Sequence, residues 1–373
     1  MKLSIAKGEL QKGLARIQAI VEKRNSMPIL ANVMLQATEG DPGSLEISAT
    51  DLEVGIRGRQ SAEVEKSGGL TVSAKTLFEI VRELPEDMVH LESTSNSFLS
   101  IRCDRSQFKL SGTSPEEYPT LPEFSPEHTV TIPSEILATM VERTMYAAST
   151  DETRYNLNGV YLEVVGETNQ LRLVATDGHR LAMVESEIPG DLTPLQSGVI
   201  IPRKGLAELK RLLDEDMVDE IELAFEGNSG LARGGEVTLV MRLIEGEFPN
   251  YEQVIPGESS VQVIVDADRL SRALRRVVLM SSQRSRAVKL EIGDRKLTVS
   301  STNPDMGDAS DELDNDYDGE TMSIGFNARY MLDALAALQV KEIRLGLNND
   351  LSPAKVKPTN DDGALAVVMP MRL

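Results

Sequence analysis

Three segments of the chain alternate apolar and polar side chains and resemble one another: 45–51, 171–177 and 297–303. In each segment a threonine stands one residue before an aspartate or asparagine, and this threonine recurs every 126 residues. Alternation with a period of two predicts a strand with one buried face, and the aspartate or asparagine after it predicts a turn. A spacing this regular predicts a repeated structural unit.

Helical patterns accompany the predicted strands. Leu10, Leu14 and Ile17 lie three or four residues apart, which is the spacing of one apolar helix face. The corresponding residues of the other two repeats are Leu137, Val141 and Thr144, and Leu270, Leu274 and Val277. We predict helices over the windows 7–24, 75–84, 134–148, 203–213, 268–280 and 327–338.

The repeat divides the chain into three domains, which we predict at 1–126, 127–256 and 257–373. The two halves of a domain also resemble each other, since residues 3–10 are similar to 70–77 and residues 130–137 to 199–206. The predicted fold is therefore α+β, with three similar domains, each an internally duplicated unit of one strand, one helix and further strands. Such a repeat is also compatible with a scaffold that has no set function.

Composition narrows the class of protein. The chain has 373 residues, a net charge of −20, one cysteine, no tryptophan and 4% aromatic residues. A single cysteine, Cys103, cannot form a disulfide within the chain and fits a reducing cytoplasm. No run of about 18 apolar residues predicts a membrane span, and the N-terminal residues lack the pattern of a signal peptide. We therefore expect a cytoplasmic protein with aliphatic cores.

Charge is distributed unevenly between the predicted elements. The helical windows contain 17 basic and 9 acidic residues, so they are net positive in a chain of net charge −20. If equivalent helices face the same way, they form one basic surface that can neutralise phosphates without reading bases. For any single residue, a solvated helix face is the simpler interpretation. The candidates for DNA binding are Lys12, Arg16, Arg24, Lys75, Arg82, Arg203, Lys204, Lys210 and Arg211, with Arg269, Arg272, Arg275 and Arg276 as further helical cations.

Helix packing limits the size of any ring that these helices could line. Neighbouring helices pack about 8–10 Å apart, so six of them leave a bore of roughly 9 Å. Twelve helices leave a bore of about 28 Å by the same geometry. Duplex DNA is roughly 20 Å across, so a ring that encircles it requires two chains.

Motifs for catalysis, metals or cofactors are absent from the sequence. It has no Walker loop, no Gly-x-Gly-x-x-Gly motif and no metal-ligand spacing among its three histidines. Asp177-Gly-His179-Arg180 resembles an acid–base site, but Asp-Gly between two alternating runs favours a hairpin turn. We therefore expect no catalytic residue, no metal and no cofactor.

Two further segments are unusual. The stretch 303–320 has eight acidic residues and no basic one, and Gly325 stands where a calcium loop requires glutamate. This pattern favours a solvated loop or an exposed strand. The C-terminal segment 367–373 is apolar, and we expect an edge strand whose pairing ends at Pro370. Its two methionines would suit an adaptable binding surface.

Several motifs resemble those of the bacterial DNA polymerase III beta subunits, the beta sliding clamps, over the whole chain. They are MPIL at 27–30, TDLE at 50–53, LNG at 157–159, ATDGHRLA at 175–182, IPRKG at 201–205, FPNY at 248–251 and the C-terminal VMPMRL. The resemblance implies a head-to-tail homodimeric ring of six domains around duplex DNA, without catalysis. It also implies that a clamp loader opens the ring. The DNA polymerase III catalytic subunit, other polymerases and repair proteins would dock through short linear peptides.

The resemblance further implies particular site residues and a cytoplasmic, nucleoid-associated protein. The resemblance places the dimer contact between Phe108 and Leu110 of one chain and Leu279 and Met280 of the other. The chain departs from the family pattern at Gln253, where some relatives carry arginine, and at Asn156, where some carry tyrosine. The implied peptide-binding residues are Leu157, Thr176, Gly178, His179, Arg180, Leu181, Pro249, Val254, Val367, Val368, Met369, Pro370, Met371 and Arg372.

The residues by themselves leave two other classes of function open. One is a β-rich scaffold that binds proteins but not DNA, and the other is a DNA-repair or nucleotide enzyme that uses Asp177 and His179. Retention on closed circular DNA would favour the clamp over the scaffold. Turnover that is lost in a His179→Ala variant would favour the enzyme.

Overall fold

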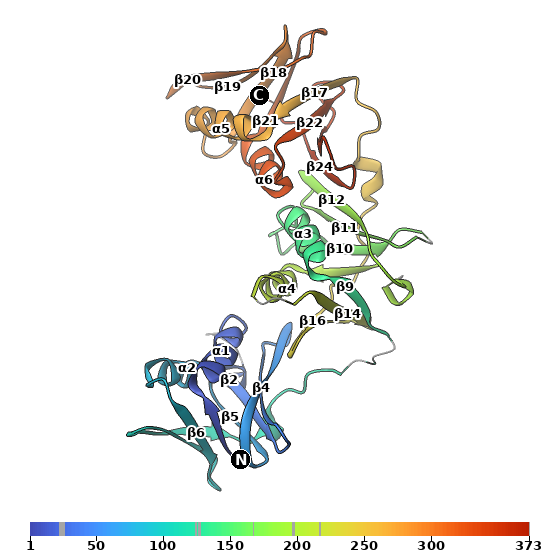
Figure 1. The fold of residues 1–373 in the computed structure, drawn as a ribbon. Helices are drawn as coiled ribbons and strands as arrows, with labels where there is room; N and C mark the ends of the chain where they lie inside the picture. The colour runs from blue at the N-terminus through green and yellow to red at the C-terminus, as the bar shows by residue number, and fades with distance from the viewer. Residues whose placement is uncertain are drawn as a thin grey trace. The chain divides into compact units, whose positions relative to one another are not determined.

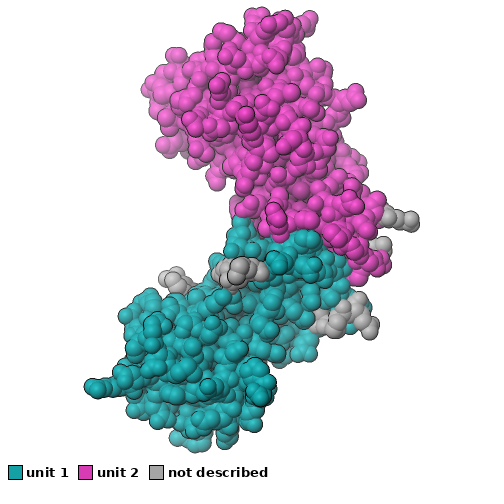
Figure 2. Space-filling view, in the orientation of Figure 1, with its two compact units in different colours: residues 1–134, 207–243 teal, residues 135–206, 244–373 magenta. Residues whose placement is uncertain are grey.

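The computed structural model forms two compact units, which Figure 2 colours separately. Unit 1 comprises Met1–Ser134 and Ala207–Leu243, and unit 2 comprises Glu135–Leu206 and Ile244–Leu373. The structure describes residues 1–21, 27–123, 125, 128–166, 168–195, 198–215 and 218–372.

Unit 1 begins with two copies of the predicted repeat of a strand, a helix and further strands, which number three in each copy (Figure 1). The first copy contains β1 (Lys2–Ala6), α1 (Lys7–Ile17), β2 (Asn32–Thr38), β3 (Gly43–Thr50) and β4 (Val54–Lys66). The second contains β5 (Gly68–Ser73), α2 (Ala74–Glu83), β6 (Met88–Ser93), β7 (Phe98–Cys103) and β8 (Ser106–Thr113). Unit 1 also contains β9 (Val130–Pro133), β14 (Glu220–Glu226), β15 (Ser229–Gly234) and β16 (Val237–Arg242).

Unit 2 continues the same order of elements. Its first part contains most of α3 (Ser134–Met145), then β10 (Gly159–Val164), β11 (Gln170–Thr176), β12 (Arg180–Glu187) and β13 (Val199–Pro202), and α4 (Arg203–Glu215) begins there. One further copy contains β17 (Val261–Asp266), α5 (Ala267–Val277), β18 (Ala287–Gly293), β19 (Lys296–Asn303) and β20 (Gly307–Asp314). The last contains β21 (Met322–Asn327), α6 (Ala328–Leu338), β22 (Glu342–Leu347), β23 (Ala354–Pro358) and β24 (Ala364–Val368). The fold is thus α+β, with three similar domains that are each duplicated internally; their boundaries stay a prediction.

One antiparallel sheet of twelve strands runs through unit 1, in the order β1-β6-β7-β8-β5-β2-β3-β4-β16-β15-β14-β9. The pairing of β4 with β16 joins its two parts, with Gly58 opposite Val237 and Val54 opposite Met241. Both are the last strand of their copy of the repeat. The junction is therefore made by equivalent strands of two copies.

Unit 2 repeats this junction in a second sheet. Eight strands lie in the order β13-β10-β11-β12-β24-β23-β22-β17, and a separate sheet has the order β20-β19-β18-β21. Here β12 pairs with β24, from Arg180 opposite Val368 to Val184 opposite Ala364. These are again the last strands of two copies, so the same strand-pairing rule operates twice in the chain.

The helical windows predicted from sequence are confirmed, and their apolar stripes are buried. Leu10, Leu14 and Ile17 are at most 1% exposed. Asp266 caps α5 by accepting the Arg269 N–H at 2.8 Å. The ends differ from the predicted windows: α1 ends at Ile17 rather than at 24, and α3 at Met145 rather than at 148. Directly after α1 the backbone forms a 3₁₀-type turn, in which the Gln18 N–H donates to the Ala15 carbonyl, three residues earlier, at 3.2 Å.

The structure corrects one prediction and confirms another. The C-terminal strand β24 is not an edge strand, because it pairs with β12 on one side and β23 on the other. Its five residues are all buried, as in an interior strand, and pairing ends at Val368, before Pro370. The acidic stretch 303–320 contains β20, a largely exposed strand. Among the described residues, no helix is long and apolar enough to cross a membrane.

Candidate binding surfaces

The turn between β11 and β12 is a hairpin, as its Asp-Gly sequence predicts. Asp177 Oδ1 accepts the backbone N–H groups of His179 (2.9 Å) and Arg180 (3.1 Å). Gly178 has a φ of 84°, a left-handed conformation that glycine adopts without strain. The Thr176 hydroxyl donates to the Arg180 carbonyl at 2.7 Å. Asp177 therefore shapes the turn, and His179 is exposed beside it.

Arg180 lies at the centre of a charged and aromatic cluster. Its side chain is only 11% exposed, with Nε 3.0 Å from Asp177 Oδ2 and Nη1 2.6 Å from Asp333 Oδ2 on α6. The guanidinium carbon lies 4.7 Å from the ring centre of Tyr330 and 5.3 Å from that of Tyr146. Burial raises the pKa of Tyr146 well above its ordinary value. Arg180 therefore connects β12 to α6.

The C-terminal segment runs beside the same turn. The Met369 N–H donates to the His179 carbonyl at 2.9 Å, and the Met371 N–H to the Gly325 carbonyl at 2.9 Å. Met369 is 38% exposed, whereas Val368 just before it is buried. The segment thus places a methionine at the surface next to His179.

The chain between β16 and β17, called here the linker (residues 243–260), covers an apolar cluster on one face of the eight-stranded sheet. Leu181 and Val367 are each 2% exposed and pack with Tyr251 of the linker. The Tyr251 hydroxyl lies 2.5 Å from Nη1 of Arg172, which fixes the linker to β11. Val254 of the short helix η6 (Tyr251–Val254) is 46% exposed. The cluster therefore has a buried floor, and the linker that covers it carries one exposed apolar side chain, that of Val254.

A hollow of about 620 Å³ opens where the hairpin turn, residues 146–154 and α6 meet. Its lining includes six arginines and three aspartates, so it carries net positive charge. His179 and Arg180 line it, as do residues that the sequence did not single out: Arg154, Arg284, Asn327, Arg329, Tyr330 and Asp333. In the sequence, the signal for these residues was the spacing of Tyr330 and Asp333, which lie one turn apart on α6. A helical pattern, however, does not reveal which strand the helix faces.

The predicted peptide-binding residues are only partly assembled by these contacts. Residues 176–181 and 367–369 meet through the β12–β24 pairing. Leu157 follows Arg154, whose Nη1 donates to the Asp177 carbonyl at 2.5 Å. Pro249 is exposed on the linker, as is Arg372 near the end of the chain, and Pro370 and Met371 are half-buried. Their joint role in peptide binding stays a prediction.

The predicted DNA-binding cations lie on helices and are partly paired there. Arg203 donates to the Ser149 carbonyl at 3.4 Å, and Lys12, Arg16 and Lys204 lie on α1 and α4. The other pairs are Lys75–Glu79 (3.8 Å), Arg82–Glu83 (3.1 Å), Lys210–Asp214 (2.8 Å) and Arg211–Glu208 (3.0 Å). Pairs as exposed as Lys75–Glu79 are worth less than about 1 kcal/mol, so phosphates can replace such carboxylates. Arg24 lies outside the described residues.

The four residues predicted at the dimer contact lie on two surfaces of one chain. Phe108, on β8, is 39% exposed, and Leu110 is half-buried. Leu279, in the short helix η7 (Val278–Met280), is 71% exposed, and Met280 is half-buried. Exposed large apolar side chains of this kind suit a protein contact.

Family models of the DNA polymerase III beta subunit match the chain in three consecutive parts: the N-terminal domain at residues 1–122, the central domain at 131–250 and the C-terminal domain at 252–372. The chain belongs to the DNA polymerase III beta subunit family. The beta sliding clamp of Caulobacter vibrioides is 37% identical over 377 residues, with both chains covered completely.

Crystal structures of other clamps share the fold. The Bartonella birtlesii sliding clamp bound to griselimycin has a TM-score of 0.94 and 35% identity, with both chains fully covered. The Bacillus subtilis sliding clamp has a TM-score of 0.95 and 28% identity, over 100% of this chain and 99% of that one. As a beta subunit, the protein is a non-catalytic sliding clamp of DNA replication. The alternative of an enzyme built on Asp177 and His179 is therefore excluded, in keeping with the structural role of Asp177 in the turn.

Proposed function

We propose that two copies of the chain form a head-to-tail ring around duplex DNA and hold the replicative polymerase on it. The observation that carries the ring is the strand-pairing rule. Within the chain, β4 pairs with β16 and β12 with β24, always as last strands of their copies. Two last strands, β8 and β20, have no such partner among the described strands. Pairing β8 of one chain with β20 of another satisfies the rule at both junctions and closes the ring after two chains.

The surfaces around β8 and β20 are complementary in charge and in apolar content. β20 carries Asp308, Asp311, Glu312 and Asp314 and no basic residue, whereas β8 carries Lys109 and no acidic residue, and the turn before it carries Asp104 and Arg105. Phe108 would pack against Leu279 of the second chain. Electrostatic complementarity of this kind favours the head-to-tail arrangement, because two β20 edges would repel one another.

The helices would face the DNA in this ring. Their cations neutralise phosphates rather than read bases, so binding should be independent of sequence and sensitive to salt. Lys75 is readily accessible, since its side chain is 71% exposed. The ring thus gives a chain of net charge −20 a basic inner surface.

Partners would dock on unit 2, beside the hairpin turn. The exposed side chains of Val254 and Met369 offer apolar contacts, and the adjoining hollow offers arginine and tyrosine side chains. That combination suits a short peptide with leucine or phenylalanine anchors, as in the tail of a polymerase or a repair protein. A clamp loader would use the same contacts to open the ring, in the cytoplasm at the nucleoid.

Retention on circular DNA tests the proposal. Protein loaded onto a nicked circular plasmid should stay bound through gel filtration and dissociate once a restriction enzyme linearises the plasmid. Blocking both ends of the linear DNA with a tightly bound protein should restore retention. Equal retention on circular and open linear DNA would contradict a ring and favour ordinary binding to the duplex surface.

A further inference from the structure

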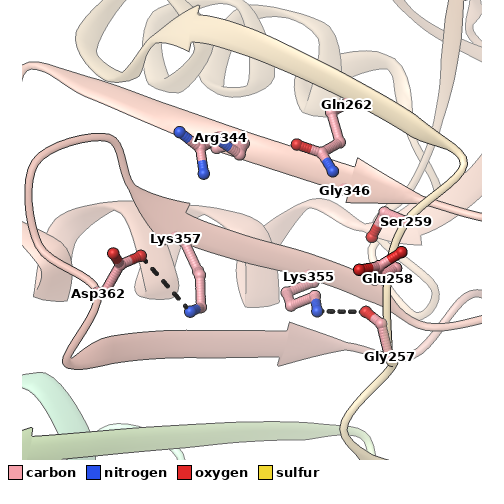
Figure 3. Close-up of a pocket in the computed structure, with 9 residues that line it drawn as sticks. All are labelled: Gly257, Glu258, Ser259, Gln262, Arg344, Gly346, Lys355, Lys357 and Asp362. Atoms are coloured by element: carbon pink, nitrogen blue, oxygen red, sulfur yellow. Dashed lines mark hydrogen bonds and ion pairs between the residues drawn. The ribbon is translucent and has the colours of Figure 1, made fainter.

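A second, smaller hollow lies in unit 2, on β17, β22 and β23. It encloses about 210 Å³ and is bordered by the linker at Gly257–Ser259. Figure 3 shows Arg344 and Gln262 on one side of it and Lys357 and Lys355 on the other. Neither the proposed ring contact nor the proposed DNA surface involves these side chains.

The register of the sheet places this hollow beside the apolar cluster under the linker. Gln262 lies opposite Gly346, Gly346 opposite Lys355, Lys355 opposite Val367, and Val367 opposite Leu181. Residues opposite one another in antiparallel strands point to the same face. The basic side chain of Lys355 is therefore the immediate neighbour of the buried floor of the cluster.

Positive charge in the small hollow is incompletely balanced, because three basic residues line it (Arg344, Lys355 and Lys357) and only two acidic ones, Glu258 and Asp362. Arg344 makes no hydrogen bond or ion pair with any residue that the structure describes. Lys357 Nζ lies 3.8 Å from a carboxylate oxygen of Asp362, whose side chain is 93% exposed, and such a pair is weak. Lys355 donates to two linker carbonyls, one of them that of Pro256 at 2.8 Å, which are neutral acceptors.

Two further observations describe the same environment. The pKa of Lys355 is lowered, first by burial and then by the charge of Lys357, while the charge of Glu258 acts in the opposite direction. Ser259 lies against Gly346, where a Cβ would collide with its hydroxyl oxygen, and this oxygen is buried without a hydrogen-bond partner in the described part of the chain. A hydroxyl donor is thus available at the edge of a basic hollow.

The volume of the small hollow and the charge of its side chains indicate what it can bind. A volume of about 210 Å³ is below the range of roughly 300–1,000 Å³ that holds a drug-sized ligand, but it can accept a single side chain. An arginine without a partner binds a carboxylate through two parallel hydrogen bonds. We propose that this hollow binds an aspartate or glutamate side chain of the same docking segment whose apolar anchors contact Val254 and Met369. The inference rests on the proposed peptide site and specifies a second, charged element of its ligand.

Strand spacing fixes where the acidic residue stands in the segment. Arg344 on β22 lies opposite Lys357, and Val367 on β24 lies opposite Lys355, so the two are separated by two strand spacings across the sheet and two residues along it, about 12 Å in all. An extended peptide rises about 3.3 Å per residue, so the acidic residue lies about three to four positions from the apolar anchors. Both directions of the peptide are compatible with this distance, and the experiment therefore includes both.

Fluorescence polarisation with the full-length protein tests the inference. The probes are a peptide with leucine and phenylalanine anchors, and versions with glutamate or glutamine three residues before or three residues after the anchors. On the unmodified protein, glutamate in one of the two places should tighten binding about fivefold over glutamine, as expected for a partly exposed ion pair. Arg344→Gln and, separately, Lys357→Gln should remove this preference. Lys341→Gln, an exposed cation outside the hollow, should retain it.

The outcomes separate the two proposals. If the anchor peptide binds but glutamate and glutamine versions bind equally at both positions, the acidic subsite is wrong and the peptide site stands. If the anchor peptide does not bind at all, the peptide site fails and the inference fails with it. A glutamate preference that survives in both the Arg344 and Lys357 variants would place the acidic contact elsewhere.

Discussion

Arg180 Nη1 and Asp333 Oδ2 lie 2.6 Å apart, although 153 residues separate them in the chain. Arg180 begins β12 and Asp333 lies in the middle of α6, so this ion pair connects a hairpin turn to a helix of a different copy of the repeat. The pair also borders the hollow next to the proposed peptide site. Its first role is therefore to hold that hollow in shape.

Removing Arg180 should destabilise unit 2 more than removing the other arginine beside Asp333. Arg180→Ala leaves Asp177 and Asp333, which are 14% and 33% exposed, without their shared cation. Breaking such a pair costs about 3 kcal/mol. Arg329→Ala removes a 62% exposed partner 3.8 Å away and should cost less than about 1 kcal/mol. Urea unfolding and hydrogen exchange at α6 measure both, and equal losses would contradict a central role for Arg180.

Truncating the apolar side chains of η7 should yield monomers. Leu279→Ala combined with Met280→Ala removes two aliphatic side chains from the proposed β8–β20 junction, at about 2–5 kcal/mol for each side chain that is buried there. Leu351→Ala is the matched control, because Leu351 is similarly exposed at 68% but lies outside the junction. Sedimentation equilibrium measures the dimer. A tight dimer in the double variant would mean that the chains associate elsewhere.

Charge reversal on α4 should weaken the loading of the protein onto DNA and should also reduce the salt dependence of its affinity for DNA. Arg203→Glu with Lys204→Glu removes up to two phosphate contacts, so the slope of log affinity against log salt should fall in magnitude by up to about 2. Asp316→Lys with Asp318→Lys, in the acidic stretch after β20, should leave both quantities unchanged. Binding would be compared over a salt series on DNA of several sequences. A strong preference for one sequence would contradict contacts made to phosphates.

Deleting residues 369–373 should abolish peptide binding and preserve the dimer. Strand pairing of β24 ends at Val368, so the deletion spares the sheet; from the described part of the segment it removes the hydrogen bonds of Met369 and Met371. Calorimetry with the leucine and phenylalanine peptide measures binding, and the solution mass measures the dimer. Undiminished binding would move the site away from the C-terminus, and monomers would show that these residues support the fold.

Alkaline pH should destabilise unit 1 through Tyr118. This hydroxyl accepts the Thr50 N–H and donates to the Asn32 carbonyl, both at 3.2 Å. Burial raises the pKa of Tyr118 to about 12 from 10.0. The raised value means that the neutral phenol stabilises the fold below pH 10, and that this contribution, roughly 3 kcal/mol, is lost as the pH rises through 12.

A Tyr118→Phe variant isolates this effect. At neutral pH it should lose about 1 kcal/mol for each missing hydrogen bond, yet its stability should change less than that of the unmodified protein between pH 10 and 12. Unfolding curves across this range, with the difference in tyrosine absorbance between the two proteins, provide the measurement. Parallel pH profiles would show that other groups control alkaline unfolding.

Much of the fold follows from local sequence. The spacing of 126 residues, the alternation before Thr50 and the helical stripe of Leu10, Leu14 and Ile17 each reflect short-range geometry. Side chains must alternate along a strand and recur every three or four residues on a helix, so these patterns are visible in the chain itself. The turn at Asp177 is equally local, since its hydrogen bonds reach only two or three residues.

Tertiary structure alone decided which elements became neighbours. The sequence shows that β24 is apolar, but an apolar run is compatible with an edge or an interior position, and only its pairing with β12 and β23 distinguishes them. The contact of Arg180 with Asp333 and the approach of Arg344 to Lys357 likewise depend on strand order. Hydrogen bonds and ion pairs are short-ranged in space and indifferent to separation along the chain. The sequence therefore determined the elements and their chemistry, and the packing of those elements determined which charges meet.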